Sequence, residues 1–262
     1  MKTFTIAIIG HGIVGQATER VINKDHKVII HDPAQDKIVD YPKADVIFIC
    51  TPTEFVEQYI KELRLHPFVY VRSTIPFKMV EGTNIAVWPE FLTERTAVRD
   101  SLNPKLNVIG GTAEQQDRLC EITKFNKFDG TTNVYAALMK LTTNVYFAQK
   151  VSFANVMFNL CKENGLDYNK LKQILGADAR TWIEDHWTVP GPDGKFGYGG
   201  KCLPANVDIM LELLQGKDKE LISKYKEYNE EQRNEDSDNL SLIHISEPTR
   251  PLYISYAVLW VK

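Results

Sequence analysis

Residues 3–32, TFTIAIIGHGIVGQATERVINKDHKVIIHD, decide the fold of this chain. An apolar, β-branched run over 3–9 has the length of a strand, and a second apolar run ends at Asp32. The glycine turn GHGIVG at 10–15 lies between them, and a helix over 17–23 can follow it. The order is therefore strand, G-x-G-x-x-G turn, helix, strand and acid, which is the order of a dinucleotide-binding βαβ unit.

Each part of this unit has a physical task. The first glycine permits the tight turn, the second leaves room for a pyrophosphate, and the third lets helix and strand pack closely. The helix N-terminus offers unpaired N–H groups to phosphate, and an acid after the second strand can accept hydrogen bonds from a ribose 2′-OH, which favours NAD over NADP. A glycine-rich turn without a ligand is the alternative. The pattern predicts an NAD site at Gly10, Gly12, Ile13, Val14, Gly15 and Asp32.

Composition narrows the class of protein. The chain has 262 residues, 44% hydrophobic and 25% charged, with a net charge of −3. These values are ordinary for a soluble globular protein, and without a basic block we expect no nucleic-acid partner. No apolar run approaches the roughly 18 residues of a membrane span, so we expect no membrane partner. The four cysteines lack paired or zinc-binding spacing, which predicts reduced thiols, no metal site and a cytoplasmic location.

Four further apolar runs indicate an α/β fold. They cover 45–50, 68–71, 84–87 and 106–109, alternate with helical or irregular crossovers, and end in polar or glycine residues. We therefore predict a Rossmann-like, doubly wound parallel sheet over residues 1–130. A stretch without Pro or Gly over 133–164 predicts one long helix, which places a helical domain at 131–216 and suggests a spine or dimer contact.

The remaining segments are less regular. Helices are predicted over 168–175 and 207–215, with a Gly- and Pro-rich loop over 188–204 between them. Residues 217–239 are highly charged and can be a solvated helix or disordered. The tail 240–262 breaks with the preceding composition and resembles a translated sequencing adapter, so it is excluded from fold reasoning.

Three polar sets can carry chemistry. Glycines precede Cys202, which lets a ligand approach this thiol closely, and a nearby cation would favour the reactive thiolate. Lys140 and Asn144 are four residues apart, on one face of the long helix. The third set follows the strands, where ligands of such sheets bind: Thr51, Ser73, Thr74, Glu90 and Glu94.

The motifs in this order resemble the nucleotide-sugar dehydrogenases, the UDP-glucose and GDP-mannose dehydrogenase family. They are GHGIVG, the acid after the second strand, CTPT, STIP, PEFLTE, NPKLNVIGG, ALMKLTTN with AQKVSFAN, and GYGGKCLP, and they cover roughly residues 4–210. The resemblance implies an NAD domain, a long central helix that makes a homodimer, a nucleotide-sugar substrate, and a second Rossmann-like domain that this sequence lacks.

The resemblance also implies roles. Cys202 would add to a sugar aldehyde and later carry a thioester, Lys140 and Asn144 would stabilise an oxyanion, and Glu90 would assist hydrolysis with Thr74 placing the reacting group. Cofactor contacts would extend to Thr51, Pro52, Thr74 and Glu94. Substrate contacts would come from Glu90, Phe91, Leu92, Lys140, Asn144, Phe196, Tyr198 and Gly199.

One departure bears on activity. The family continues the cysteine motif with Lys-Asp, whereas this chain has Ala205-Asn206. An amide can form hydrogen bonds but cannot accept a proton as a carboxylate does. Another base, slow turnover or a non-catalytic assembly subunit would each account for Asn206. A 3-hydroxyacid dehydrogenase is the remaining alternative, although a single hydride transfer needs no thiol.

Overall fold

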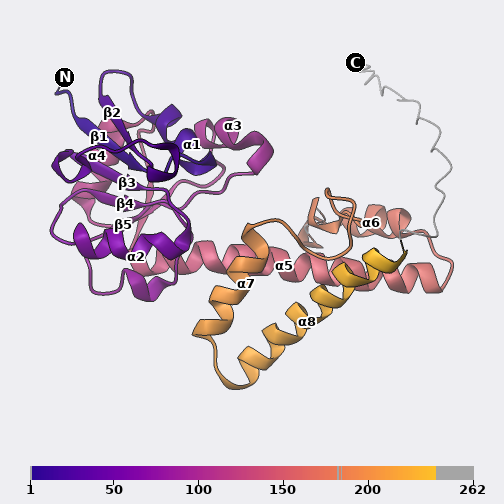
Figure 1. Cartoon of the computed structure of the whole chain (residues 1–262). Coiled ribbons are helices and arrows are strands. Elements are labelled where there is room, and N and C mark those ends of the chain that lie inside the picture. The colour runs from indigo at the N-terminus through magenta and orange to yellow at the C-terminus, as the bar shows by residue number, and fades with distance from the viewer. Residues whose placement is uncertain (1, 182, 184, 240–262) are drawn as a thin grey trace, which may run out of the picture.

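The computed structural model describes residues 2–181, 183 and 185–239. Figure 1 shows a sheet-containing unit from which one long helix extends. The sheet has the order β2-β1-β3-β4-β5-β6-β7. Its strands are β1 Thr5–Ile9, β2 Lys27–His31, β3 Val46–Ile49, β4 Val69–Val71, β5 Ala86–Val87, β6 Val108–Gly110 and β7 Asp129–Thr131. Neighbours run parallel except β5 and β6, which are antiparallel. The predicted α/β class is confirmed, with one antiparallel pair and a last strand, β7, that the sequence reading missed.

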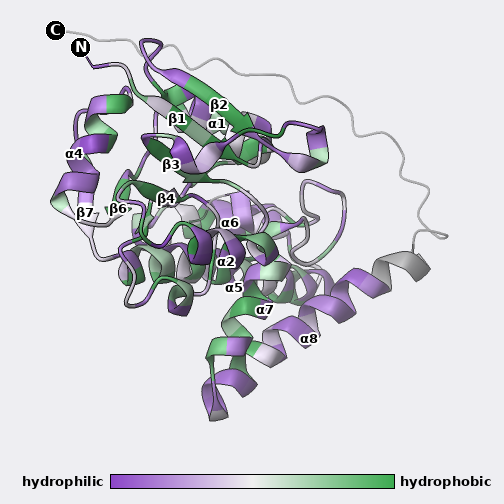
Figure 2. Ribbon diagram, turned by 60° about the vertical axis from the view of Figure 1, so that its left-hand side comes forward, coloured by the Kyte–Doolittle hydropathy of each residue, from purple (hydrophilic) through white to green (hydrophobic). Residues whose placement is uncertain are grey.

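Helices cover both faces of the sheet. Successive side chains of a strand point to opposite faces, so Ile6 and Ile8 pack beneath α1 (Ile13–Val21) and α4 (Ala113–Ile122). Ala7 and Ile9 pack on the other face with α2 (Thr53–Glu62). Strands buried on both sides need continuous apolar sequence, and Figure 2 shows β1 and β3 largely in the hydrophobic colour.

The long helix α5 (Asn133–Glu163) confirms the helix predicted over 133–164. Its first residue is anchored to the sheet, because the Asn133 side chain donates hydrogen bonds to the backbone oxygens of Val80, Thr83 and Ile85. The Thr132 side chain caps the helix N-terminus. The start of α5, and the residues one or two turns later, are therefore fixed relative to the sheet.

Three further helices pack beyond the sheet. These are α6 (Tyr168–Gly176), α7 (Cys202–Leu213) and α8 (Gly216–Asn239). Figure 1 shows that α7 leads away from α5 and that α8 returns toward it, so that the two helices form a hairpin. The charged segment 217–239 is thus helical, and Figure 2 shows that α8 is mostly hydrophilic. The predicted adapter-like tail, 240–262, lies outside the described residues.

Two boundaries near the predicted site differ from the sequence reading. α1 begins at Ile13, within the glycine motif, rather than at 17. α7 begins at Cys202, so this cysteine is the first residue of a helix rather than part of the preceding loop. A short helix, α3 (Ala97–Leu102), packs against α1. Across the described ranges, no helix combines the length and apolar character needed to cross a membrane.

Candidate active site

The glycine turn has the geometry that its motif predicts. Gly10 has a φ of 84°, and a Cβ built there would lie 2.9 Å from the backbone oxygen of Cys50. A Cβ on Gly15 would lie 2.1 Å from the backbone oxygen of Gly10. A Cβ on Gly12 would meet nothing within 4 Å, so the space above this residue is open. The protein itself requires the first and third glycines, whereas the second leaves room for a ligand.

Polar groups around this open space fit a dinucleotide. Gly12 is the N-cap of α1 and provides no side-chain cap, which leaves backbone N–H groups of the first turn for a phosphate. Oδ2 of Asp32 accepts hydrogen bonds from the His11 backbone N–H at 2.7 Å and from Gln35 Nε2 at 2.9 Å. The buried Thr51 hydroxyl has no hydrogen-bond partner among the described residues. Two of the predicted cofactor residues at the ends of β2 and β3, Asp32 and Thr51, thus lie beside the glycine turn.

The ends of β3 and β4 are tied together beside this turn. The Ser73 hydroxyl donates to the backbone oxygen of Thr51 at 2.5 Å, and the Thr53 hydroxyl donates to that of Thr74 at 2.8 Å. Pro52, another predicted cofactor contact, is the N-cap of α2. The side chain of Glu94 lies outside the part of the chain that the structure describes.

Lys140 and Glu90 form a nearly buried ion pair. Lys140 Nζ lies 3.4 Å from Glu90 Oε1, with side-chain exposures of 8% and 13%. The ammonium also lies 5.1 Å from the centre of the Phe91 ring, and Glu90 Oε2 accepts a 2.7 Å hydrogen bond from the Leu92 backbone N–H. Four of the predicted catalytic and substrate residues therefore meet, although three of them come from the PEFL segment and one from α5. Asn144, one turn further along α5, is also buried.

The position of Lys140 follows from how α5 packs. Ala136 and Ala137 belong to the core of the sheet, whereas Leu141 and Val145 belong to a second core with α7. Lys140 lies where α5 passes from one core to the other. A buried cation at the junction of two cores can stabilise negative charge that develops on a ligand there.

Cys202 begins α7, the helix that packs against α5. The thiol is exposed, and its neighbour Leu203 packs against the core that contains Leu141 and Val145. One turn later, the Asn206 side chain donates a 2.7 Å hydrogen bond to the Cys202 backbone oxygen. Its Oδ1 atom is buried and has no partner among the described residues. Asp208 instead forms an ion pair with Lys226 on α8, so it does not replace the carboxylate absent at 206.

Side chains of α8 hold the loop before Cys202. The sequence reading did not predict this contact. Oδ1 of Asn229 accepts a 2.6 Å hydrogen bond from the Tyr198 backbone N–H, and its Nδ2 donates to the Tyr198 backbone oxygen at 3.1 Å. Arg233 forms an ion pair with Asp193, and its guanidinium lies where a Cβ on Gly199 would be. The Tyr198 side chain is buried, and burial raises the pKa of its hydroxyl to about 12.

The same loop is also held from α5. Asn155 accepts a 3.1 Å hydrogen bond from the Gly197 backbone N–H, and the Phe196 ring packs on Phe158 at 5.3 Å between centroids.

A signal for the contact with α8 was present in the sequence, because Asn229, Gln232 and Arg233 follow the i, i+3, i+4 spacing of one helix face. It was hidden because a polar face within a charged segment usually faces water.

Structural neighbours define the class of the fold. UDP-glucose dehydrogenase from Pyrobaculum islandicum has a TM-score of 0.68 at 21% identity, covering 88% of this chain and 68% of that chain. 3-Hydroxyisobutyrate dehydrogenase from Mycobacterium tuberculosis has a TM-score of 0.70 at 15% identity, covering 88% and 96%. Together with the glycine turn, these likenesses show a Rossmann-like fold.

Sequence comparison shows which proteins this chain resembles. Residues 135–231 match the central domain of the UDP-glucose/GDP-mannose dehydrogenase family. UDP-glucose 6-dehydrogenase of Rickettsia typhi is 27% identical over 207 residues, which are 67% of this chain and 46% of that protein. GDP-mannose 6-dehydrogenase of Pseudomonas aeruginosa is 35% identical over 130 residues, 48% of this chain and 28% of that protein. The chain is therefore similar to members of the UDP-glucose/GDP-mannose dehydrogenase family, and it spans less than half the length of these two relatives.

Proposed function

We propose that this chain carries the cofactor site and the reacting groups of an NAD-dependent dehydrogenase that oxidises a nucleotide-sugar primary alcohol to a carboxylate. The observation that carries the proposal is the Lys140–Glu90 pair at the junction of the two cores, with the helix that begins at Cys202 packed against the same stretch of α5. UDP-glucose, with UDP-glucuronate as product, is the substrate that the names of several relatives favour.

The cofactor site uses the glycine turn and the strand ends. When bound, NAD accepts one hydride in each of two oxidation steps. The open space above Gly12 and the uncapped N-terminus of α1 suit the pyrophosphate, while Asp32 suits a ribose hydroxyl. Residues 1–130 are proposed as this cofactor domain and residues 131–216 as the helical domain that completes the site.

The thiol accounts for a second oxidation at the same carbon. The Cys202 thiolate adds to the C6 carbonyl of the sugar aldehyde, the carbonyl oxygen takes a proton, and a thiohemiacetal forms. Loss of hydride from C6 and of the hydroxyl proton leaves a thioester. Lys140 and Asn144 stabilise the oxyanion, Glu90 takes a proton from the attacking water, and Thr74 places the reacting group. Water supplies the second carboxylate oxygen, and the thiolate leaves.

A non-catalytic relative that binds NAD is the second candidate, and Asn206 favours it. Its amide is buried and cannot act as a general base. A single-step 3-hydroxyacid dehydrogenase shares the fold and a helix lysine, but that reaction gives no task to Cys202.

Assembly and location complete the proposal. α5 exposes large apolar side chains at Tyr146, Phe153 and Leu160, each about half exposed and spaced by seven residues along the helix. We propose that a second copy of the chain covers this face in a homodimer, because an apolar stripe of this kind is costly to leave in water. A reducing cytoplasm would keep the Cys202 thiol available for the chemistry.

Counting NADH per molecule of UDP-glucose consumed tests the function. NAD binding is first measured by calorimetry, so that an inactive chain is distinguished from one that does not bind cofactor. The thioester route predicts two NADH per sugar and UDP-glucuronate as product. One NADH per sugar would support the single-step alternative, and NAD binding without NADH formation would support the non-catalytic one.

A further inference from the structure

Arg72 is a buried charge that the chemistry above does not use. It follows β4 directly and is 3% exposed. Nη1 donates a 3.2 Å hydrogen bond to the Trp88 backbone oxygen, and the guanidinium carbon lies 3.7 Å from the centre of the Trp88 ring. Nε is buried without a hydrogen-bond partner among the described residues. A cation removed from water in this way needs a nearby negative charge.

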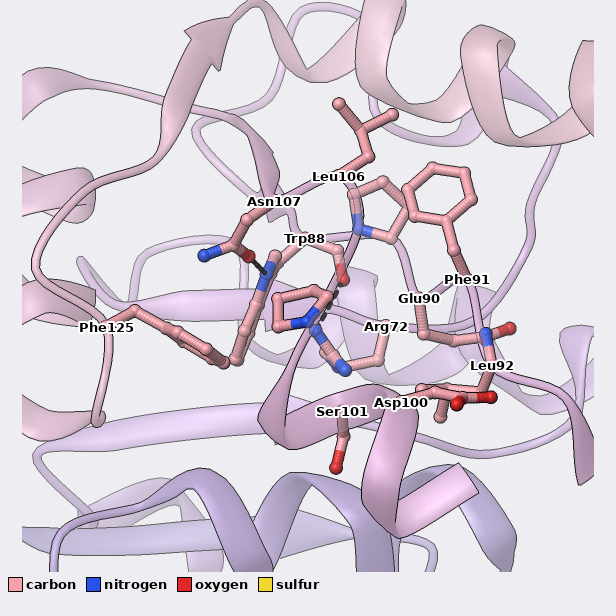
Figure 3. A pocket seen from close by; sticks show the side chains of 12 residues that line it. Arg72, Trp88, Glu90, Phe91, Leu92, Asp100, Ser101, Leu106, Asn107 and Phe125 are labelled. Atoms are coloured by element: carbon pink, nitrogen blue, oxygen red, sulfur yellow. Dashed lines mark hydrogen bonds between the residues drawn. The ribbon is translucent and has the colours of Figure 1, made fainter. Parts of the chain in front are cut away.

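Glu90, two residues after Trp88, is an acidic residue that interacts with this guanidinium electrostatically. Figure 3 shows Arg72 between the Trp88 ring and the Glu90 side chain, at a small cavity that all three line. Burial lowers the pKa of the Arg72 guanidinium to about 10, and interactions with Cys50 and Glu90 oppose this shift. The group therefore remains a cation at neutral pH.

The other charged or titratable groups near Glu90 come from different helices and strands. Lys140 on α5 pairs with it from the other side, at 3.4 Å. Asp100 on α3 lines the same cavity, but its Oδ2 already accepts a hydrogen bond from the Thr96 hydroxyl at 2.6 Å. The Cys50 thiol at the end of β3 is neutral, because burial raises its pKa to about 11. Lys140 is therefore the cation paired with Glu90, and Arg72 is a second cation that lines the cavity beside it.

We propose that Arg72 is a positioning residue for Glu90: its bond to the Trp88 carbonyl fixes the turn that carries the carboxylate, and its charge attracts that carboxylate and holds it beside Lys140. The proposal rests on the proposed function, in which Glu90 takes a proton from water. A protonated carboxyl could not do so, and it would also leave Lys140 without its ion partner.

Two variants separate charge from packing. Arg72→Met removes the charge and keeps a long side chain, and Arg72→Lys keeps the charge without the planar fork. The pH dependence of kcat for NADH formation is measured for both. For Arg72→Met we expect the acidic limb of the kcat–pH profile to move up by about one pH unit. This shift corresponds to roughly a tenfold loss of rate at low pH. Arg72→Lys should keep the wild-type limb.

A uniform rate loss with an unmoved limb in Arg72→Met would overturn the proposal, since a merely structural role would lower the rate at every pH. If Arg72→Met does not fold, an acidic limb displaced in Arg72→Lys overturns it, and a retained limb supports it.

A second measurement keeps the test independent of turnover. Infrared spectra are compared between Arg72→Met and the double variant Arg72→Met/Glu90→Gln at mildly acid pH, with the wild type and Glu90→Gln as the matched pair. We expect a protonated-carboxyl band in the first comparison that the matched pair lacks. Identical differences in the two comparisons would overturn the proposal, even if the chain proved to have no dehydrogenase activity.

Discussion

The glycine turn at 10–15 and the cysteine loop at 193–201 are both rich in glycine, but different parts of the chain determine their shapes. In the turn, Gly10 and Gly15 are required by backbone atoms of the turn itself and of the adjacent strand β3. In the loop, the polar contacts come from Asn155 on α5 and from Asn229 and Arg233 on α8. The turn is therefore readable from a short motif, whereas the loop depends on side chains supplied from both sides of it in the sequence.

A pair of glycine variants tests the turn. Gly15→Val should disrupt the fold and NAD binding together, because its side chain would collide with the Gly10 backbone oxygen. Gly12→Val should melt like the wild type but lose NAD affinity by about 100-fold or more, roughly 3 kcal/mol of binding free energy. Calorimetry and thermal melts measure both effects. Wild-type affinity in Gly12→Val would show that no cofactor occupies the space above this residue.

The alkylation rates of two cysteines test which of the two regions exposes its thiol to solvent. Iodoacetamide at about pH 8 should alkylate the exposed Cys202 on the order of 100-fold faster than Cys50, because the thiolate is the reactive form and burial raises the pKa of Cys50 to about 11. Mass spectrometry of the peptides gives both rates. Comparable rates for the two thiols would contradict the packing described at the end of β3.

An α8 variant tests the support of the cysteine loop. Asn229→Ala removes both hydrogen bonds to the buried Tyr198 backbone, so we expect the free energy of unfolding to fall by about 2–4 kcal/mol. Glu220→Ala, at an exposed position of the same helix, should change it by less than about 0.5 kcal/mol. Urea unfolding measures both. Equal effects would show that α8 does not hold the loop.

This difference also sets what sequence reasoning could predict. The βαβ unit, α5, Lys140 and Cys202 were predicted because each depends on a local motif or on helical spacing. Family resemblance implied only that Lys140 and Glu90 act in one reaction, and their contact was not predicted, since no spacing links the PEFL segment to α5. Arg72 and Asn229 were missed because burial, not residue type, gives them their importance, and burial is decided by the tertiary fold.

The smallest predicted effect concerns the base that the family has and this chain lacks. Asn206→Asp should raise the rate of acid formation several-fold, because a carboxylate at the start of α7 can take a proton as the amide cannot. Burying that charge will also lower the melting temperature. Assays of UDP-glucuronate formation give the rate. An unchanged rate in a folded variant would assign the role of base to Lys140 or Glu90.

The central claim is that the thiol on α7 completes a site whose cofactor half lies on the sheet. Cys202→Ala tests it most directly, with NAD binding and acid formation measured on the same preparation. We predict an unchanged NAD dissociation constant and no detectable formation of the sugar acid. Acid formation at the wild-type rate in this variant would contradict the account, because a thioester cannot form without the sulfur.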